Sequence, residues 1–136
     1  MWTYNQSSGQ LSKDGILVDA DCYSGSFPDG FNNPEKQSFP DIGPIPEGLW
    51  EICGPPFSDT AHGPYVLRLE PAPDTNTFGR TGFLMHGKPL PPADIRSGSK
   101  GCVCAAHETR TRVYQSGDTK LQVISGLAPI DPEIQV

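Results

Sequence analysis

The sequence is short of basic residues, of cysteine and of long apolar runs, and each shortage excludes a class of protein. Ten Lys and Arg against sixteen Asp and Glu give a net charge of -6, whereas nucleic acid and anionic membrane surfaces are bound by clustered basic residues. No apolar run approaches the roughly 20 residues of a membrane-spanning helix. We therefore expect no nucleic acid partner and no membrane insertion.

Cysteine occupies four of the 136 positions. This is too few for a disulfide-dense mini-protein, and the spacing does not fit a zinc site with paired Cys-x-x-Cys motifs. Cys22 and Cys53 fall on expected strands, and two interpretations of them stay open: a disulfide formed in an oxidising compartment, or two free thiols.

The start of the chain shows neither the basic nor the apolar region of a signal peptide. This pattern predicts a protein made in the cytoplasm without a signal peptide. Any export is expected to use another route.

Glycine and proline are abundant, at 15 residues each, which is more than a helical bundle accommodates. Since 136 residues leave room for one core, we predict a single domain over residues 1–136, of the mainly β class, with long Gly/Pro-rich loops. The longest loop is Ser24–Pro46. Loops of this length inside small domains are usually functional, so we expect it to form one wall of a substrate cleft.

Alternation of apolar and polar residues predicts the strands. Leu67 and Leu69, for example, alternate with charged residues, as is typical of a strand with one buried face. One short helix is expected from about His107 to Ser116, ended by Gly117, and residues 127–136 are expected to form a surface tail. The expected strands are Trp2–Asn5, Ile16–Tyr23, Leu49–Ile52, Pro64–Glu70, Gly82–His86 and Lys120–Ile124.

A histidine and a cysteine, which can act together as base and nucleophile, lie at the ends of two expected strands. His86 ends one strand, and Cys102 follows a glycine-rich turn at the start of another. A thiol becomes a strong nucleophile as thiolate, and a nearby imidazole can accept its proton. The backbone N–H groups of Lys100, Gly101 and Cys102 could converge on the oxyanion of a tetrahedral intermediate. The residues therefore suggest cysteine-based acyl transfer.

Two other interpretations of these residues remain open. Cys102 and Cys104 would lie on one strand face, and with His86 and His107 they could form a Cys2His2 zinc site, although such sites favour cysteines about 2–4 residues apart. An oxidised link involving Cys104 would inactivate the thiol. The chain could also be a catalytically inactive cell-wall-binding or adaptor domain, although such a domain has no need for a base and a thiol together.

The arrangement of these residues resembles that of the L,D-transpeptidases. His86-Gly87 followed by Ser99-Lys100-Gly101-Cys102 is similar to the His…Ser-x-Gly-Cys signature of that family, with 16 positions from the histidine to the cysteine. Further motifs follow the order seen in the L,D-transpeptidase effectors of type VI secretion systems. They are Trp2-x-Tyr4, Ser7-x-Gly9-x-Leu11, Tyr23-Ser24-Gly25, Asn32-Asn33-Pro34, Gly43-Pro44-Ile45-Pro46-x-Gly48 and Phe83-Leu84-Met85-His86-Gly87.

This resemblance covers the chain from Trp2 to about Ser125 and implies an L,D-transpeptidase-like β-sandwich or barrel. It implies that Cys102 is the nucleophile and forms a thioester, that His86 is its base, and that a backbone carbonyl around Gly87 orients the imidazole. Ser99 would shape the oxyanion turn. No cofactor is implied.

The residue that binds the substrate carboxylate stays open. Relatives often carry Arg or Asn where this chain has Cys104, and the effectors often carry Arg where it has His107. Arg96, Arg110 and Arg112 are candidates, and no spacing argument selects among them.

The resemblance also implies the substrate and the partners. The cysteine would attack the stem peptide of peptidoglycan between its third residue and the terminal D-alanine. Water as acceptor gives L,D-carboxypeptidase activity, and a free D-amino acid gives exchange. The protein would be an antibacterial toxin delivered by a secretion apparatus into the periplasm of target bacteria, with a cognate immunity protein in the producing cell.

Overall fold

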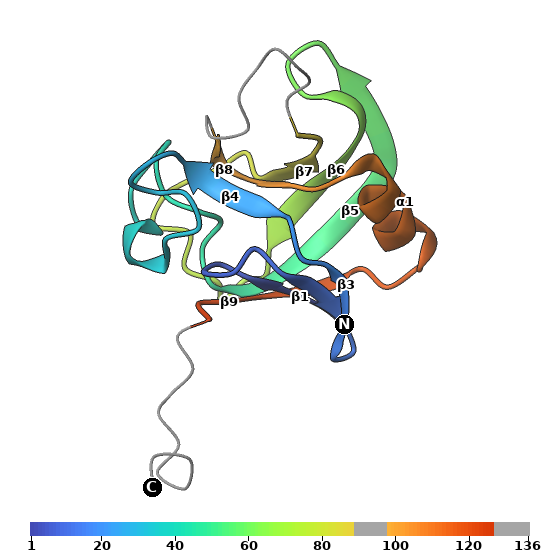
Figure 1. Cartoon of the computed structure of the whole chain (residues 1–136), viewed down its shortest axis with the longest axis horizontal. Helices are drawn as coiled ribbons and strands as arrows, with labels where there is room; N and C mark the ends of the chain where they lie inside the picture. The colour runs from blue at the N-terminus through green and yellow to red at the C-terminus, as the bar shows by residue number, and fades with distance from the viewer. Residues whose placement is uncertain (89–97, 127–136) are drawn as a thin grey trace, which may run out of the picture.

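The computed structural model describes residues 1–88 and 98–126, and it is mainly β (Figure 1). The described part contains one α-helix, one 3-10 helix and nine strands. In chain order they are β1 (Trp2–Asn5), β2 (Leu11–Lys13), β3 (Ile16–Asp19), β4 (Tyr23–Ser26), η1 (Pro34–Lys36), β5 (Gly48–Asp59), β6 (Gly63–Pro71), β7 (Leu84–His86), β8 (Gly98–Cys104), α1 (His107–Gln115) and β9 (Lys120–Ile124).

The strands form one mixed sheet in the order β3-β2-β1-β9-β5-β6-β7-β8-β4. In Figure 1, β4 and β8 lie above β1 and β9, with the longer β5 and β6 running between them. Two hydrogen bonds connect the segments that flank β1 and β2 with those that precede β4 and β5. The Gln6 side-chain amide donates to the carbonyl of Ile45 at 2.8 Å, and the N–H of Cys22 donates to the carbonyl of Gly9 at 3.1 Å.

The core lies between these two groups of strands. It is built from inward-facing residues at every second position, as the alternation of the sequence predicts. Trp2 from β1, Trp50 from β5 and Met85 from β7 belong to one buried apolar cluster, together with residues of β6, β8 and β9. The predicted mainly β class is therefore confirmed.

The local patterns located several elements correctly. Strands β1 and β9 have the predicted bounds, and β6 extends the predicted strand by one residue at each end. Helix α1 runs over the predicted residues and is followed by Gly117 with a φ of +71°, the left-handed conformation that favours glycine after a helix. No helix in residues 1–88 or 98–126 is long and apolar enough to cross a membrane.

The single strand predicted over Ile16–Tyr23 is wrong, because the chain turns after β3 and pairs again as β4. The Asp19 carboxylate causes the turn. It accepts the N–H of Asp21 at 2.8 Å and the hydroxyl of Thr109, on helix α1, at 2.6 Å. A contact across 90 residues of sequence is invisible to a local pattern.

Three further differences concern the site. Cys102 lies inside strand β8, whereas the sequence suggested the start of a strand. Strand β7 begins only at Leu84, since Gly82 has a φ of +80° that interrupts regular pairing. The segment predicted as one long loop includes residues 24–26 of β4 and the whole of η1. The expected tail, residues 127–136, lies outside the described residues.

Candidate active site

The parallel pairing of β7 with β8 brings the histidine strand beside the cysteine strand. Met85 pairs with Val103, and His86 pairs with Cys104. Met85 and Val103 both point into the core. Because side chains alternate along a strand, His86, Cys102 and Cys104 all lie on the opposite face. One imidazole and two thiols therefore share a single face of two neighbouring strands.

His86 is held in a defined tautomer by the next residue. Its Nδ1 lies 2.9 Å from the carbonyl oxygen of Gly87. A carbonyl only accepts hydrogen bonds, so Nδ1 carries the proton and Nε2 keeps a free lone pair in the neutral ring. Burial lowers the pKa of His86 below its ordinary value, although the Gly87 carbonyl opposes this. The ring is thus neutral at pH 7, with Nε2 free to accept a proton.

The Cys102 thiol is half-buried, and its Sγ lies 3.8 Å from the carbonyl oxygen of Gly82. Burial raises the pKa of this thiol. The N–H of Leu84 and the positive charge of Arg80 act in the opposite direction and lower it. Cys102 is therefore a protonated thiol in the absence of substrate, and it needs a base to become a thiolate. The N–H of Leu84 and the charge of Arg80 would stabilise that thiolate.

The second cysteine, Cys104, is fully buried and touches the imidazole. Its Sγ lies 3.9 Å from both ring nitrogens of His86. Equal distances to two nitrogens indicate packing against the ring, because a hydrogen bond would favour one of them. Burial raises the pKa of Cys104 to about 12, so it stays protonated at neutral pH. In this conformation the direct neighbour of His86 is Cys104.

Cys102 is the diagonal neighbour of His86 in the β7–β8 pair, since it lies two residues before Cys104. Ordinary strand spacing puts their Cα atoms roughly 8 Å apart. In this conformation the ring contacts Cys104 and the Cys102 sulfur contacts the Gly82 carbonyl, so the pairing requires the two side chains to move toward each other. Catalytic hydrogen bonds are commonly long in ligand-free enzymes and shorten when substrate binds. The geometry thus leaves the predicted pairing of His86 with Cys102 in place as a prediction.

Ser99 organises the turn before the cysteine, as its place in the signature suggests. Its hydroxyl donates to the carbonyl of Cys102 at 2.6 Å and accepts the N–H groups of Gly25 at 3.1 Å and Gly101 at 3.3 Å. In this conformation the N–H of Gly101 therefore already has a hydrogen-bond partner. Lys100 and Cys102 remain the expected backbone donors.

Sequence reasoning missed Arg80, which joins this turn to the long loop. Only 6% of the residue is exposed. Its Nη1 donates to the carbonyls of Gln37 at 2.6 Å and Pro44 at 2.8 Å, and its Nη2 donates to those of Gly43 at 2.8 Å and Lys100 at 3.2 Å. A side chain at Gly101 would stand 2.5 Å from Nη2, so glycine is needed there.

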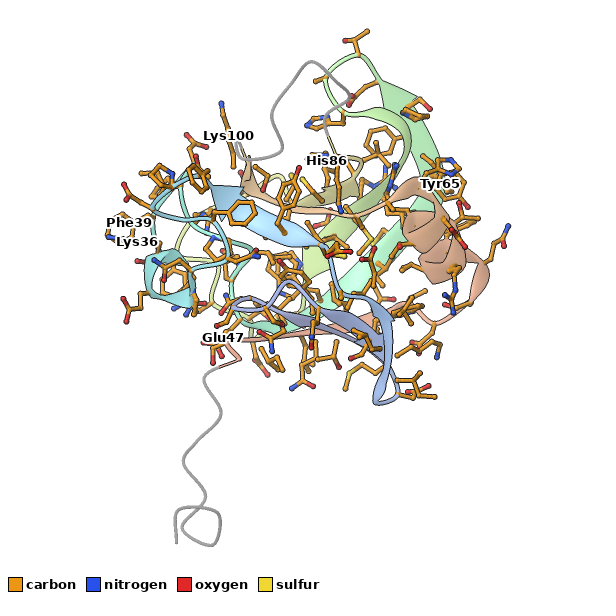
Figure 2. All side chains as sticks on the ribbon, in the orientation of Figure 1. Lys36, Phe39, Glu47, Tyr65, His86 and Lys100 are labelled. Atoms are coloured by element: carbon orange, nitrogen blue, oxygen red, sulfur yellow. The ribbon has the colours of Figure 1, made fainter. Side chains whose placement is uncertain are left out.

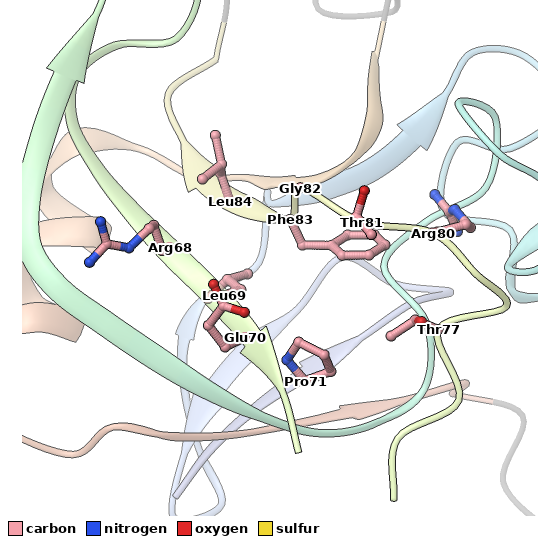
Figure 3. A pocket seen from close by; sticks show the side chains of 10 residues that line it. All are labelled: Arg68, Leu69, Glu70, Pro71, Thr77, Arg80, Thr81, Gly82, Phe83 and Leu84. Carbon is pink, nitrogen blue, oxygen red and sulfur yellow. The ribbon is translucent and has the colours of Figure 1, made fainter. Parts of the chain in front are cut away.

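His86 and the surroundings of the Cys102 sulfur border different cavities, and Cys102 itself lines neither of them. Gly82 and Leu84, the neighbours of the Cys102 sulfur, line a cavity of about 290 Å³ that also contains Arg68, Glu70 and Phe83 (Figure 3). His86 lines a larger cavity of about 530 Å³. Figure 2 shows His86 and Lys100 along the same upper side of the molecule. The long loop borders a third hollow, of about 210 Å³, through Pro40 and Asp41.

The three substrate-binding candidates have different positions. Arg110 lines the larger cavity beside His86, whereas Arg112 is exposed on helix α1 and is absent from that lining. Arg96 lies outside the described residues. His107 also lines the cavity, and so does His62, which no sequence motif singled out.

The competing interpretations of the cysteines receive no support from the geometry. Cys22, Cys53, Cys102 and Cys104 are all free thiols. Within residues 1–88 and 98–126, no three His, Cys, Asp or Glu side chains are grouped so that they could hold a metal ion. No protein-family model, no curated protein and no solved structure matches this chain, so the function is argued from the site.

Replacing Arg80 tests its two roles separately. Arg80→Met should lower the free energy of unfolding by about 2 kcal/mol, because it leaves buried carbonyls without donors. It should also slow alkylation of Cys102 by iodoacetamide, because the thiol loses a nearby cation. Arg80→Lys should restore much of the alkylation rate and little of the stability, since lysine lacks the planar fork. Half-buried Cys53, whose pKa is shifted by burial, Glu70, Glu51 and Arg68 and not by Arg80, serves as the internal reference in a mass-spectrometric assay. An unchanged ratio of Cys102 to Cys53 labelling in Arg80→Met would contradict the electrostatic role.

Proposed function

We propose that this protein is a cysteine-dependent enzyme of the L,D-transpeptidase type that acts on peptidoglycan stem peptides. The observation that carries the proposal is the hydrogen bond from His86 Nδ1 to the Gly87 carbonyl. It leaves Nε2 as a free base on the strand face that also bears Cys102. A carbonyl here takes the orienting role that a carboxylate takes in other triads. The His…Ser-x-Gly-Cys resemblance supports the same assignment.

Acylation follows from these positions. Nε2 of His86 accepts the proton of the Cys102 thiol, and the thiolate attacks the carbonyl between the third stem residue and D-alanine. The N–H groups around Lys100 and Cys102 stabilise the oxyanion. His86 then returns the proton to the leaving amine. The C–N bond breaks, D-alanine departs, and a thioester to Cys102 remains.

Deacylation uses the same groups in reverse. Water attacks the thioester and gives the carboxypeptidase product, or the amine of a free D-amino acid attacks and gives the exchanged peptide. In both cases Nε2 takes a proton from the attacking group and the Cys102 sulfur recovers it. Hydrolysis shortens the tetrapeptide, and exchange replaces its terminal D-alanine, so either outcome deprives the target wall of usable cross-linking donors.

The resemblance to type VI effectors extends the proposal to biology. The protein acts as an antibacterial toxin in the periplasm of a target cell, where its substrate lies, and a cognate immunity protein protects the producing cell. Such a partner would most simply cover the region between the Ser24–Pro46 loop and Cys102.

The chemistry is tested with purified stem tetrapeptides. Cys102→Ala and His86→Ala should each abolish hydrolysis and exchange while circular dichroism stays unchanged, because one removes the nucleophile and the other its base. Cys104→Ser is the matched control, since it alters a thiol that stays protonated next to the same imidazole. Wild-type turnover by Cys102→Ala would exclude the mechanism, and activity lost only in Cys104→Ser would transfer the role to Cys104.

The pH profile tests the state of His86. Because burial lowers the pKa of the ring, the decline of kcat/KM for the tetrapeptide on acidification should have its midpoint below pH 6.5, the ordinary imidazole value. The decline reflects protonation of Nε2. The profile is measured on the folded protein, with circular dichroism at each pH as the control. A decline centred above pH 6.5 would contradict a buried neutral base.

Expression in a sensitive bacterium tests the biological role. The wild type fused to an export signal should arrest growth and deplete tetrapeptide stems, whereas the unexported form and exported Cys102→Ala should not, since the substrate lies outside the cytoplasm. Analysis of the extracted wall provides the readout. Toxicity from the cytoplasmic form, or from exported Cys102→Ala, would overturn this role.

A further inference from the structure

All three histidines of the chain line one cavity. His62, His86 and His107 surround the hollow of about 530 Å³, and Lys88 and Arg110 line it as well. The chain as a whole is acidic, with a net charge of -6, so this concentration of basic side chains is a local feature. The carboxylate of Asp59 lies 3.0 Å from Nδ1 of His62, one of the lining histidines.

Arg110 gives this cavity a buried positive charge. The residue is only 4% exposed. Its Nε donates to the carbonyl of Ala105 at 3.1 Å, and its Nη1 donates to those of Pro64 at 2.6 Å and Tyr65 at 2.8 Å. Successive carbonyls of a regular strand point in opposite directions, and Tyr65, with a φ of +57°, departs from that geometry. The backbone is shaped to hold this guanidinium.

The partners of Arg110 are all neutral among the described residues. A buried charge without a counter-ion is costly, and an anion that reaches it is correspondingly favoured. Its Nη2 donates to no described residue. That nitrogen lies 2.9 Å from the point where a Cβ on Gly87 would stand, so the absence of a side chain at Gly87 leaves Nη2 accessible beside His86.

The position of His86 determines which anion fits. In the proposed reaction, Nε2 exchanges a proton with the amine of a D-amino acid, at a hydrogen-bond distance of about 3 Å. The α-carboxylate of that amino acid is joined to the same carbon as the amine. An amine placed at Nε2 therefore carries its carboxylate into the space that His86 lines. The volume of about 530 Å³ is ample for one amino acid.

We infer that this histidine-lined cavity binds the free α-carboxylate of the D-amino acid that leaves or enters the thioester, with Arg110, His107 and His62 as its ligands. The inference rests on the proposed function and deepens it. In exchange, the neutral amine attacks the thioester carbonyl, the C–S bond breaks and an amide forms. The proton lost by the amine passes through Nε2 to the Cys102 sulfur, so atoms and charges balance.

The cavity then determines whether the thioester is attacked by water or by a D-amino acid. Water has no carboxylate and gains nothing from Arg110, whereas a D-amino acid is concentrated and oriented by it. The ratio of exchange to hydrolysis is therefore the quantity that the cavity sets. Because both products come from one thioester, this ratio does not depend on the amount of folded enzyme.

The experiment measures this ratio with a stem tetrapeptide and either D-alanine or D-alaninamide, both isotopically labelled, as acceptor. The wild type should use D-alanine at least tenfold better than the amide. His107→Glu, which puts a carboxylate into the cavity, should lower the exchange-to-hydrolysis ratio for D-alanine by roughly tenfold or more, through like-charge repulsion. Glutamate is well tolerated at a helix N-terminus, so folding should persist.

Arg112→Glu is the matched control, because it adds the same carboxylate to helix α1 outside the cavity, and its ratio should equal that of the wild type. Arg110→Lys keeps the charge without the fork and should give an intermediate ratio. Equal use of D-alanine and D-alaninamide by the wild type, resolution by water alone, or an unchanged ratio in His107→Glu would overturn the inference. The absence of any thioester mass on Cys102 would instead overturn the proposed function.

Discussion

The site depends on the parallel pairing of two short strands, β7 and β8. The register is fixed from the core side, where Met85 and Val103 pack together. A slip by one residue would turn every side chain to the other face of the sheet. It would turn the imidazole toward the apolar core and expose the apolar residues, so the hydrophobic effect holds the geometry of the candidate site. The same register makes Cys104 the direct neighbour of His86 and Cys102 the diagonal one.

The turn before Cys102 is fixed by polar contacts to the long loop. The Ser24 hydroxyl donates to the carbonyl of Gly101 at 3.0 Å and accepts the N–H of Ile45 at 2.9 Å. Arg80 joins the same two segments through its guanidinium. A loop rich in glycine and proline would otherwise lose much conformational entropy on ordering. These buried hydrogen bonds offset the entropic cost of ordering the part of the loop that lies against the turn before Cys102.

Local sequence patterns were sufficient for part of this architecture. Strands β1 and β9 and helix α1 follow from alternation and from Gly117, because each is defined by its own residues. The break between β3 and β4 could not be predicted, since it depends on Asp19 meeting Thr109 across the fold.

The same distinction applies to the site. The sequence was sufficient to select four site residues, because they form a motif with a defined spacing: His86, Gly87, Ser99 and Cys102. Arg80 could not, since its acceptors are backbone carbonyls that any residue type supplies. The contact between His86 and Cys104 required the strand register, and His62 required the fold that brings it to 5.0 Å from His86, ring centre to ring centre.

Two buried arginines give the site its electrostatic character. Arg80 stands on the thiol side and Arg110 on the imidazole side, and each donates only to backbone carbonyls among the residues described. Carbonyl dipoles hold a guanidinium in place without cancelling its charge, as a carboxylate would. An acidic protein thereby keeps a positive potential on both sides of its reactive pair. If the proposed function holds, such a potential favours the thiolate before attack, and it favours a carboxylate-bearing amino acid after the thioester has formed.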